Sequence, residues 1–146
     1  MIGFDTVFDT SFAADLTIME ESAELVKKLE KGDNKYPLFT SCCPGWIRFA
    51  ETKHPELLPY ISTCRSPMEM FGAVIKEYYK PADKEAGLET VSVAVMPCVA
   101  KKYEAARPEF VRDGVPDVDY VITTKELISM IRELGCLLYT SPSPRD

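Results

Sequence analysis

The sequence lacks the features that mark several common classes of protein. No apolar run approaches the roughly 18 residues that a membrane span requires. Acidic residues outnumber basic ones by 23 to 17, for a net charge of −6, which argues against a surface that binds nucleic acid throughout. The first ten residues contain no Lys or Arg, so they do not resemble a signal peptide. We therefore expect a soluble, cytoplasmic protein, although an export or organelle signal could be missing from a truncated N-terminus.

Cysteine is present, but not in the patterns that define small disulfide-rich or zinc-binding domains. The five cysteines are an odd number, and no two of them form a Cys-x-x-Cys motif. Cys42 and Cys43 are adjacent, whereas Cys64, Cys98 and Cys136 stand alone. In a chain without a secretion signal, such residues are metal ligands, catalytic thiols or small buried core residues.

The last eleven residues differ in composition from the rest of the chain. Residues 136–146 read CLLYTSPSPRD, and the Ser-Pro repeats are incompatible with a regular helix or strand. We interpret this segment as a non-native or disordered tail, with a linker or a strand as the alternative. Residues 1–135 then form one partial domain. Residues 4–8 could be a strand whose partner is missing, so we expect truncation at both ends.

The hydrophobic pattern predicts strands that alternate with helices. A capping box over 17–20 predicts the start of a helix with Ile18, Leu25 and Leu29 on one face and charged residues on the other. A second capping box over 123–126 predicts a helix that ends near residue 134. This alternation is typical of an α/β fold with a partly parallel sheet flanked by helices. Strands are expected at 36–40, 91–96 and 119–123, and further helices at 44–52 and 67–79.

Cysteines follow two of the expected strands, where the chain turns towards a helix. Cys42 and Cys43 follow the first strand, and Cys98 follows the second. Ligands of open α/β sheets collect outside the carboxyl ends of strands, so the two turns could direct these thiols into one crevice. Converging thiolates suit a soft metal or an iron–sulfur cluster. Adjacent residues on extended backbone point to opposite sides, so we expect Cys42 and Cys43 to have different roles.

These motifs resemble those of a known enzyme family. Residues 40–46 (TSCCPGW) and 96–104 (MPCVAKKYE) are similar to the first two signature motifs of the [FeFe]-hydrogenase catalytic subunit. Residues 14–21, 62–67 and 119–127 resemble the same family in the same order. The resemblance covers nearly all of residues 3–135. It implies that the chain is the first part of one lobe of the two-lobed iron-hydrogenase catalytic domain.

The resemblance also implies a cofactor, the H-cluster. This is a [4Fe-4S] cluster bridged by cysteine to a two-iron site that carries CO, cyanide and a dithiolate. By resemblance, Cys43 and Cys98 are two of the four cubane ligands. The other two belong to a later Cys-x-x-x-Cys motif that this chain lacks. Met96 resembles the residue that packs against the two-iron site, and Lys101 resembles the residue that hydrogen-bonds a cyanide ligand.

A proton path is implied by the same resemblance. Cys42 resembles the thiol that exchanges protons with the two-iron site, and Glu21, Ser62 and Glu24 resemble the groups that connect it to solvent. Lys28 stands where the family usually has an arginine, which keeps the charge and loses the planar fork. Without the resemblance, Glu21 and Glu24 would be read as a solvated helix face.

The implied activity is the reversible reduction of protons to hydrogen. The expected partners are ferredoxin or another electron carrier, and maturation proteins for the two-iron site. The alternative is a non-catalytic hydrogenase-like iron–sulfur protein with an assembly or sensory role. Such relatives tend to lack the first cysteine of the doublet, so Cys42 favours the enzyme. We expect the 146-residue chain by itself to be inactive.

Overall fold

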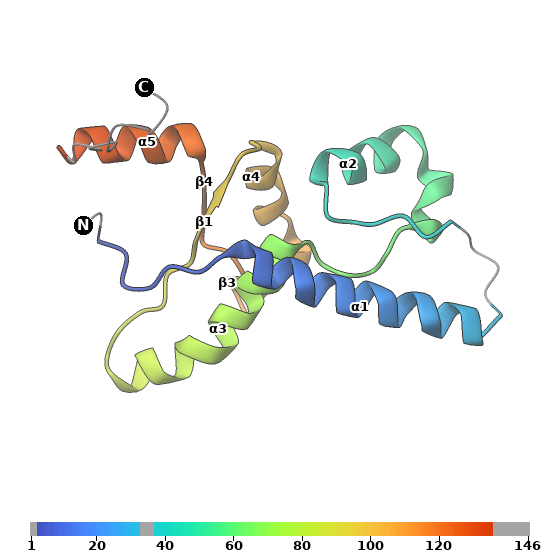
Figure 1. The fold of residues 1–146 in the computed structure, drawn as a ribbon, viewed down its shortest axis with the longest axis horizontal. Coiled ribbons are helices and arrows are strands. Elements are labelled where there is room, and N and C mark those ends of the chain that lie inside the picture. Colours follow the sequence, from blue (N-terminus) through green and yellow to red (C-terminus); the bar gives the residue numbers. More distant parts are fainter. Residues whose placement is uncertain (1–2, 33–36, 136–146) are drawn as a thin grey trace, which may run out of the picture.

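The computed structural model describes residues 3–32 and 37–135 and shows a helix-rich chain around two short pairs of strands (Figure 1). Cys136 and the predicted tail lie outside the described residues. The elements are, in chain order, α1 (Thr10–Glu30), α2 (Pro44–Lys53), the 3-10 helix η1 (Pro55–Tyr60), α3 (Pro67–Glu85), β1 (Val93–Met96), α4 (Ala100–Ala105), the 3-10 helix η2 (Pro108–Phe110), β2 (Val111–Arg112), β3 (Val115–Pro116), β4 (Tyr120–Thr123) and α5 (Thr124–Glu133).

The parallel pairing expected of an α/β fold is present. β1 pairs with β4 in parallel, with Val93 opposite Tyr120 and Met96 opposite Thr123. The capping box at the start of α5 is also present, since Thr123 and Glu126 each accept a hydrogen bond from the other's backbone N–H. The α/β fold class is therefore confirmed.

Two predicted strands are not formed as strands. Of residues 37–40, only Phe39 pairs with another segment, through a single parallel bridge to Ile61, and Tyr36 lies outside the described residues. Residues 4–8 form no strand either. Phe8 instead packs on Phe71 of α3, with ring centroids 5.3 Å apart. Aromatic packing on a helix, rather than a strand ladder, therefore fixes this segment.

A hairpin that was not predicted joins β2 to β3. The antiparallel pair places Val111 opposite Pro116 and is closed by Asp113 and Gly114, both at positive φ. Two consecutive residues at positive φ make the turn whose twist matches a hairpin, and Asp-Gly is a favoured sequence for it. The Asp-Gly dipeptide at 113–114 is the feature of the sequence that could have predicted this hairpin.

The first helix begins eight residues before its predicted start, because its N-cap is Asp9 and not Thr17. Asp9 caps α1 by accepting a hydrogen bond from Ser11 N at 2.8 Å. Thr17 is therefore inside the helix, where its hydroxyl donates to Ala13 O at 2.9 Å. A mid-helix threonine makes this bond to the carbonyl four residues earlier, so a Thr-x-x-Glu pattern by itself does not mark a helix start.

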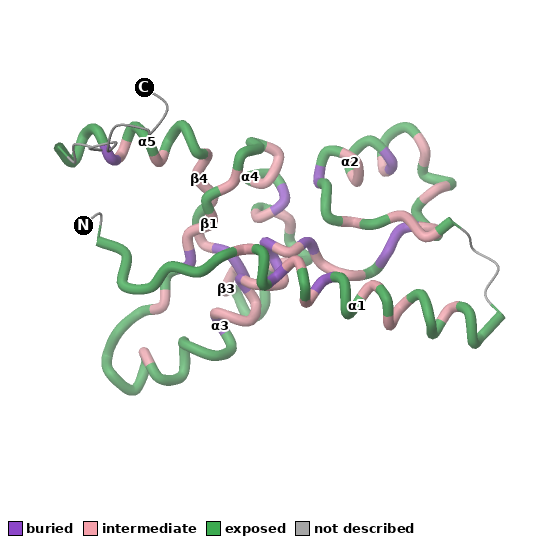
Figure 2. The backbone as a smooth tube through the Cα atoms, in the orientation of Figure 1, coloured by how far each residue is buried: buried purple, intermediate pink, exposed green. Residues whose placement is uncertain are grey.

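The inward face of α1 is the polar one. α1 packs against α3 through small residues such as Ala13 and Thr17, which are buried. The apolar stripe is largely exposed, with Ile18 at 62% and Leu29 at 57% (Figure 2). Because the apolar stripe faces outwards, the charged face turns towards the loop after η1, where Glu24 contacts Ser62 and Thr63.

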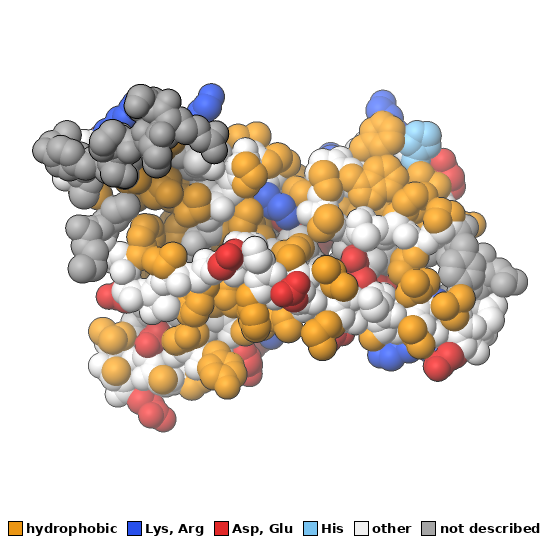
Figure 3. All heavy atoms as spheres, viewed as in Figure 1, with side chains coloured by type: hydrophobic (Ala, Val, Ile, Leu, Met, Phe, Trp, Pro, Cys, Tyr) orange, Lys and Arg blue, Asp and Glu red, His pale blue; other side chains and the backbone are white. Residues whose placement is uncertain are grey.

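The buried core of the described residues is small. Its apolar members are Ala13, Ala50, Ile61, Met68, Val118 and Ile131. Apolar side chains cover much of the visible surface instead (Figure 3). No helix in the described ranges is long and apolar enough to cross a bilayer.

Candidate functional site

The cysteine motifs lie at the starts of two helices. Cys43 is the N-cap of α2 in extended conformation, and Pro44 begins the helix. Cys98 follows the end of β1 and precedes Val99, the N-cap of α4. Cys42, Cys43 and Cys98 are all exposed and form no disulfide. Their thiols are therefore available as ligands or proton carriers.

Lys101 brings the two motifs together. Its ammonium group donates to the backbone oxygen of Cys42 at 2.8 Å and to Glu104 Oε2 at 2.7 Å. The side chains of Lys101 and Glu104 are 15% and 5% exposed, so this ion pair is largely shielded from water. The lysine three residues after Cys98 thus holds the backbone that carries the cysteine doublet. Met96, at the end of β1, is half-buried beside Pro97.

A second cluster centres on Glu24 of α1. Its Oε2 accepts a hydrogen bond from Ser62 Oγ at 2.7 Å and from Thr63 N at 3.1 Å. Its Oε1 lies 3.0 Å from Lys28 Nζ, one helical turn later. Burial alone would raise the pKa of Glu24, but the hydrogen bonds from Ser62, Lys28 and Thr63 outweigh it and lower this pKa below its usual value.

Three of the residues expected in a proton path are therefore in direct contact, and two are not. Ser62, Glu24 and Lys28 form a continuous chain. Glu21 lies on the same face of α1, and its Oε1 is buried without a hydrogen-bond partner. The Cys42 thiol has its hydrogen-bonding contact with Thr40 Oγ1, at 3.9 Å. In the ranges 3–32 and 37–135, no hydrogen bond joins Cys42 to Glu21.

Cys64, which stands alone in the sequence, also belongs to this cluster. Its thiol lies 3.7 Å from Glu24 Oε2, and its backbone N–H donates to Ser62 Oγ at 3.1 Å. Burial, followed by the negative charges of Glu24 and Glu21, raises the pKa of the Cys64 thiol. The thiol is therefore a neutral donor to Glu24. Its position two residues after Ser62 was the signal that could have indicated this contact.

The Glu24 cluster opens to solvent at the side of α1. A polar depression of about 410 Å³ is lined by Glu20, Glu24, Lys27, Lys28, Lys31, Thr63 and Cys64. The three lysines give its outer rim a positive charge. Lys28 and Glu24 thus stand at the boundary between the cluster and water.

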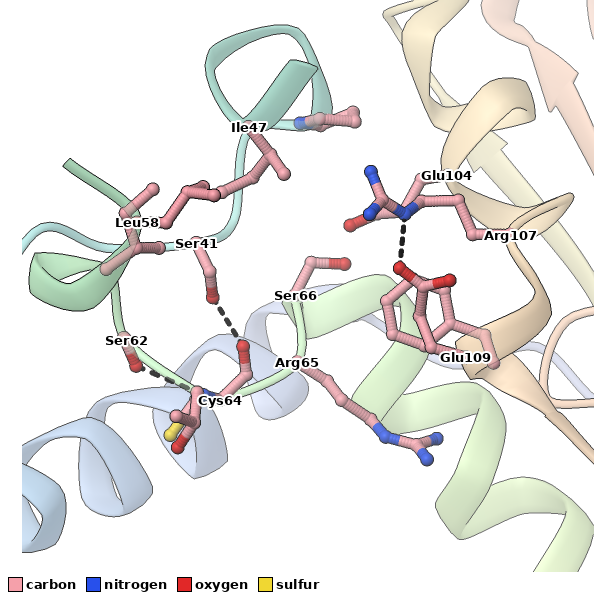
Figure 4. Close-up of a pocket in the computed structure, with 14 residues that line it drawn as sticks. Ser41, Ile47, Leu58, Ser62, Cys64, Arg65, Ser66, Glu104, Arg107 and Glu109 are labelled. Carbon is pink, nitrogen blue, oxygen red and sulfur yellow. Dashed lines mark hydrogen bonds and ion pairs between the residues drawn. The ribbon is translucent and has the colours of Figure 1, made fainter. Parts of the chain in front are cut away.

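A separate cavity of about 270 Å³ lies between α2, the loop before α3 and η2 (Figure 4). The polar groups at its edge are already paired. Ser41 donates to the backbone oxygen of Cys64, and Arg107 binds Glu51 and Glu109. The thiols of the cysteine doublet and of Cys98 do not line this cavity. It adjoins the Glu24 cluster instead, because Ser62, Thr63 and Cys64 also line it.

The donor set fits part of an iron–sulfur site. Cys43 and Cys98 are free thiols, and thiolates are the ligands that hold a [4Fe-4S] cluster, which needs four of them. Among the described residues, no group of three or more His, Cys, Asp or Glu side chains is placed to hold a metal ion. The described residues thus hold no complete set of cluster ligands, and Cys43 and Cys98 are the thiols that could contribute to one.

Comparison with known proteins agrees with this chemistry. The family described as "Iron only hydrogenase large subunit, C-terminal domain" matches residues 1–144. The NADP-reducing hydrogenase subunit HndD of Solidesulfovibrio fructosivorans is 53% identical over 139 residues, which are 92% of this chain and 24% of that protein. Iron hydrogenase 1 of Clostridium pasteurianum is 48% identical over 132 residues, 90% of this chain and 23% of that protein.

Two further similarities bear on fold and function. A single-residue variant of the [FeFe]-hydrogenase HydA1 from Chlamydomonas reinhardtii is 44% identical, with a TM-score of 0.81 over 91% of this chain and 34% of that chain. Cytosolic iron-sulfur assembly component 3 of Mus musculus is 38% identical over 152 residues, 99% of this chain and 32% of that protein. The chain spans about a quarter to a third of the curated relatives it matches.

Proposed function

Because this chain belongs to the iron-only hydrogenase large-subunit family, we propose that it forms part of a catalytic domain that reduces protons to hydrogen reversibly. The observation that carries the proposal is the contact of Lys101 with the Cys42 carbonyl. This contact joins the two motifs that the family uses to hold its cofactor. It leaves the Cys42 thiol free to exchange protons.

Cys43 and Cys98 are the residues of this chain that would hold the cubane of the H-cluster. When bound, the H-cluster would pass electrons from the carrier and provide the metal site for hydrogen chemistry. Met96 and Lys101 would line the two-iron part. The ammonium group of Lys101 has three donors, of which the Cys42 carbonyl and Glu104 accept two, so the third would suit an anionic acceptor such as cyanide.

The Glu24 cluster would carry protons between Cys42 and solvent. Ser62, Glu24 and Lys28 are linked by contacts of 2.7 and 3.0 Å, and the polar depression connects them to water. The unpartnered Oε1 of Glu21 is available to complete the path towards Cys42. General acid–base transfer needs groups within hydrogen-bond reach, directly or through one water molecule.

Ferredoxin or a similar carrier would deliver the electrons, and maturation proteins would install the two-iron site, in the cytoplasm. The 146-residue chain alone would be inactive. It provides two of four cubane ligands and leaves many apolar side chains exposed. Hydrogen evolution by the purified chain after maturation in vitro would contradict this expectation.

The second candidate is a non-catalytic iron–sulfur protein. It is supported by the 38% identity to cytosolic iron-sulfur assembly component 3. The higher identities to hydrogenases, 53% and 48%, favour the enzyme. So does Cys42, because a non-catalytic protein that binds only a cubane does not need a proton-carrying thiol beside its ligand.

A hybrid enzyme tests the proposal. Residues 3–135 would replace the matching stretch of Clostridium pasteurianum iron hydrogenase 1. We expect the matured hybrid to evolve hydrogen, and Cys42→Ala to reduce the rate by at least about a hundredfold, as removal of a general acid does. The matched control is Ser129→Ala, which removes an exposed side chain of similar size on α5, outside the cofactor motifs and the Glu24 cluster. A hybrid that holds the cubane and the two-iron site but evolves no hydrogen would favour the non-catalytic candidate.

A further inference from the structure

Glu69, in the first turn of α3, is a buried acid with no partner. It is 0% exposed, and neither carboxyl oxygen has a hydrogen-bond partner among the described residues. Its position three residues after the N-cap Ser66 is that of a capping box, and its backbone N–H donates to Ser66 Oγ at 3.4 Å. The side chain does not return the bond to Ser66 N. The carboxyl group is therefore not used for helix capping.

Three charged groups act on Glu69 from the elements around it. Glu104 and Lys101 belong to α4, and Arg65 belongs to the loop before α3. Burial, followed by the negative charge of Glu104, raises the pKa of Glu69 to about 7, although the positive charges of Lys101 and Arg65 oppose the shift. Each of the two cations already has another partner. Arg65 binds Asp117, and Lys101 binds Glu104 and the Cys42 carbonyl.

The charges around Lys101 do not balance if both nearby carboxyl groups are ionised. Glu104 lies 2.7 Å from Lys101 Nζ, and this ion pair satisfies one negative charge. A second buried carboxylate would have no cation of its own, and desolvating an unpaired charge is costly. The uncharged acid avoids the penalty for a buried charge and leaves only the smaller cost of an unpaired neutral carboxyl group.

We propose that Glu69 is a positioning residue that acts as a neutral acid and thereby leaves Lys101 committed to the Cys42 carbonyl and Glu104. An ionised Glu69 would compete with both acceptors for the same ammonium group. The orientation of Lys101, and with it the backbone of the cysteine doublet, would then depend on the proton held at residue 69. The effect on hydrogen chemistry rests on the proposed function, whereas the protonation of Glu69 does not.

Infrared difference spectroscopy tests the protonation directly. The hybrid protein would be labelled with carboxyl-carbon-13 glutamate and compared with its Glu69→Gln variant as pH is raised. We expect a neutral-carboxyl band that disappears with a midpoint near pH 7 and is missing from Glu69→Gln. If the parent and the variant gave the same carboxyl bands at roughly pH 6, Glu69 would be ionised there and the proposal would be overturned.

Two neighbouring substitutions should move this midpoint in opposite directions. Glu104→Gln removes a negative charge and releases Lys101, so the midpoint should fall. Lys101→Met removes the opposing positive charge, so the midpoint should rise. Glu133→Gln, on the exposed face of α5, is the matched control and should leave it unchanged. Equal midpoints in all four proteins would show that the proposed network does not act on Glu69.

The pH dependence of hydrogen evolution gives the functional readout. The neutral fraction of an acid with a pKa of about 7 falls about tenfold between roughly pH 6 and 8. The activity of Glu69→Gln relative to the parent should rise by up to about that factor over this range. A constant ratio would indicate a merely structural role. If the band titrates as expected but the matured hybrid evolves no hydrogen, the proposed function fails while the protonation of Glu69 stands.

Discussion

Ser62 Oγ donates a hydrogen bond to Glu24 Oε2 at 2.7 Å, across 38 positions of sequence. This contact fixes the loop after η1 against α1 and makes the serine hydroxyl part of the proposed proton path. Ser62→Ala should raise the pKa of Glu24, because the Ser62 bond is the strongest of those that lower it. Hydrogen evolution by the hybrid should fall about a hundredfold, the lower end of the range for acid–base groups.

The matched control for this substitution is Thr63→Ala. Thr63 contacts Glu24 through its backbone N–H, which the alanine variant keeps. Rates would be measured with a chemical electron donor over a range of pH. If Thr63→Ala reduced the rate as much as Ser62→Ala, the loss would come from the loop and not from the hydroxyl group.

Lys28 tests the outer end of the same path. Lys28→Met should raise the pKa of Glu24, because both the hydrogen bond and the charge of Lys28 lower it. A carboxyl whose pKa is lowered by folding stabilises the fold above its unfolded pKa, and this contribution is lost as pH falls through the folded value. Lys28→Met should therefore lower the free energy of unfolding most at neutral pH, by about 0.5–1 kcal/mol. This loss of stability should become smaller below about pH 4. Urea midpoints at the two pH values would measure it.

Lys28→Arg is the conservative control for that experiment. Arginine keeps the positive charge one helical turn from Glu24, so stability and rate should stay near those of the parent hybrid. A loss in Lys28→Arg as large as that in Lys28→Met would show that the charge is not what matters at this position.

A buried ion pair should dominate the stability of the sheet edge. Lys76 of α3 is 8% exposed and binds Asp119 and the backbone oxygen of Thr90. Asp119 also accepts from Ser92, next to β1. Asp119→Ala leaves the Lys76 charge buried without its partner, which should cost about 3–5 kcal/mol. Lys102→Ala, which breaks an exposed pair with Glu126, should change the urea midpoint little. Similar losses in both variants would contradict this assignment.

Local signals in the sequence predicted most of the regular elements. The second capping box and the apolar run 91–96 gave α5 and β1, because short-range hydrogen bonding and β-branched residues decide them. The helix start predicted from the first capping box was wrong, because the Thr17 hydroxyl donates a hydrogen bond to a carbonyl inside the helix. The orientation of α1 was not predictable from its periodicity. The periodicity does not show which face of α1 is turned towards the rest of the protein. Packing on α3 through small residues places the polar face inwards.

The candidate site was predictable only as a set of motifs. The resemblance to a known family identified the candidate residues Cys42, Cys43, Cys98, Glu24 and Ser62. It did not indicate that Lys101 reaches the Cys42 carbonyl or that Cys64 contacts Glu24. In these contacts the partner residues are 40 and 59 positions apart in the sequence. Local sequence patterns do not predict which distant segments pack together. Glu69 fits a capping pattern, and its burial is what distinguishes it.

The closeness of α3 to the segment before β4 gives a last prediction. A Cβ atom on Gly72 would lie 2.5 Å from both Asp117 O and Val118 Cγ2, whereas one on Gly45 of α2 would meet nothing nearer than 3.9 Å. Gly72 is in the interior of α3, where alanine gains helix propensity of about 1 kcal/mol, and Gly45 is in the first turn of α2, where alanine gains part of it. Gly45→Ala should therefore stabilise the hybrid. Gly72→Ala should destabilise it by about 1–3 kcal/mol, because α3 must move away from a backbone oxygen. Thermal unfolding of the two variants would measure the difference, and a Gly72→Ala protein as stable as Gly45→Ala would show that α3 does not pack this closely.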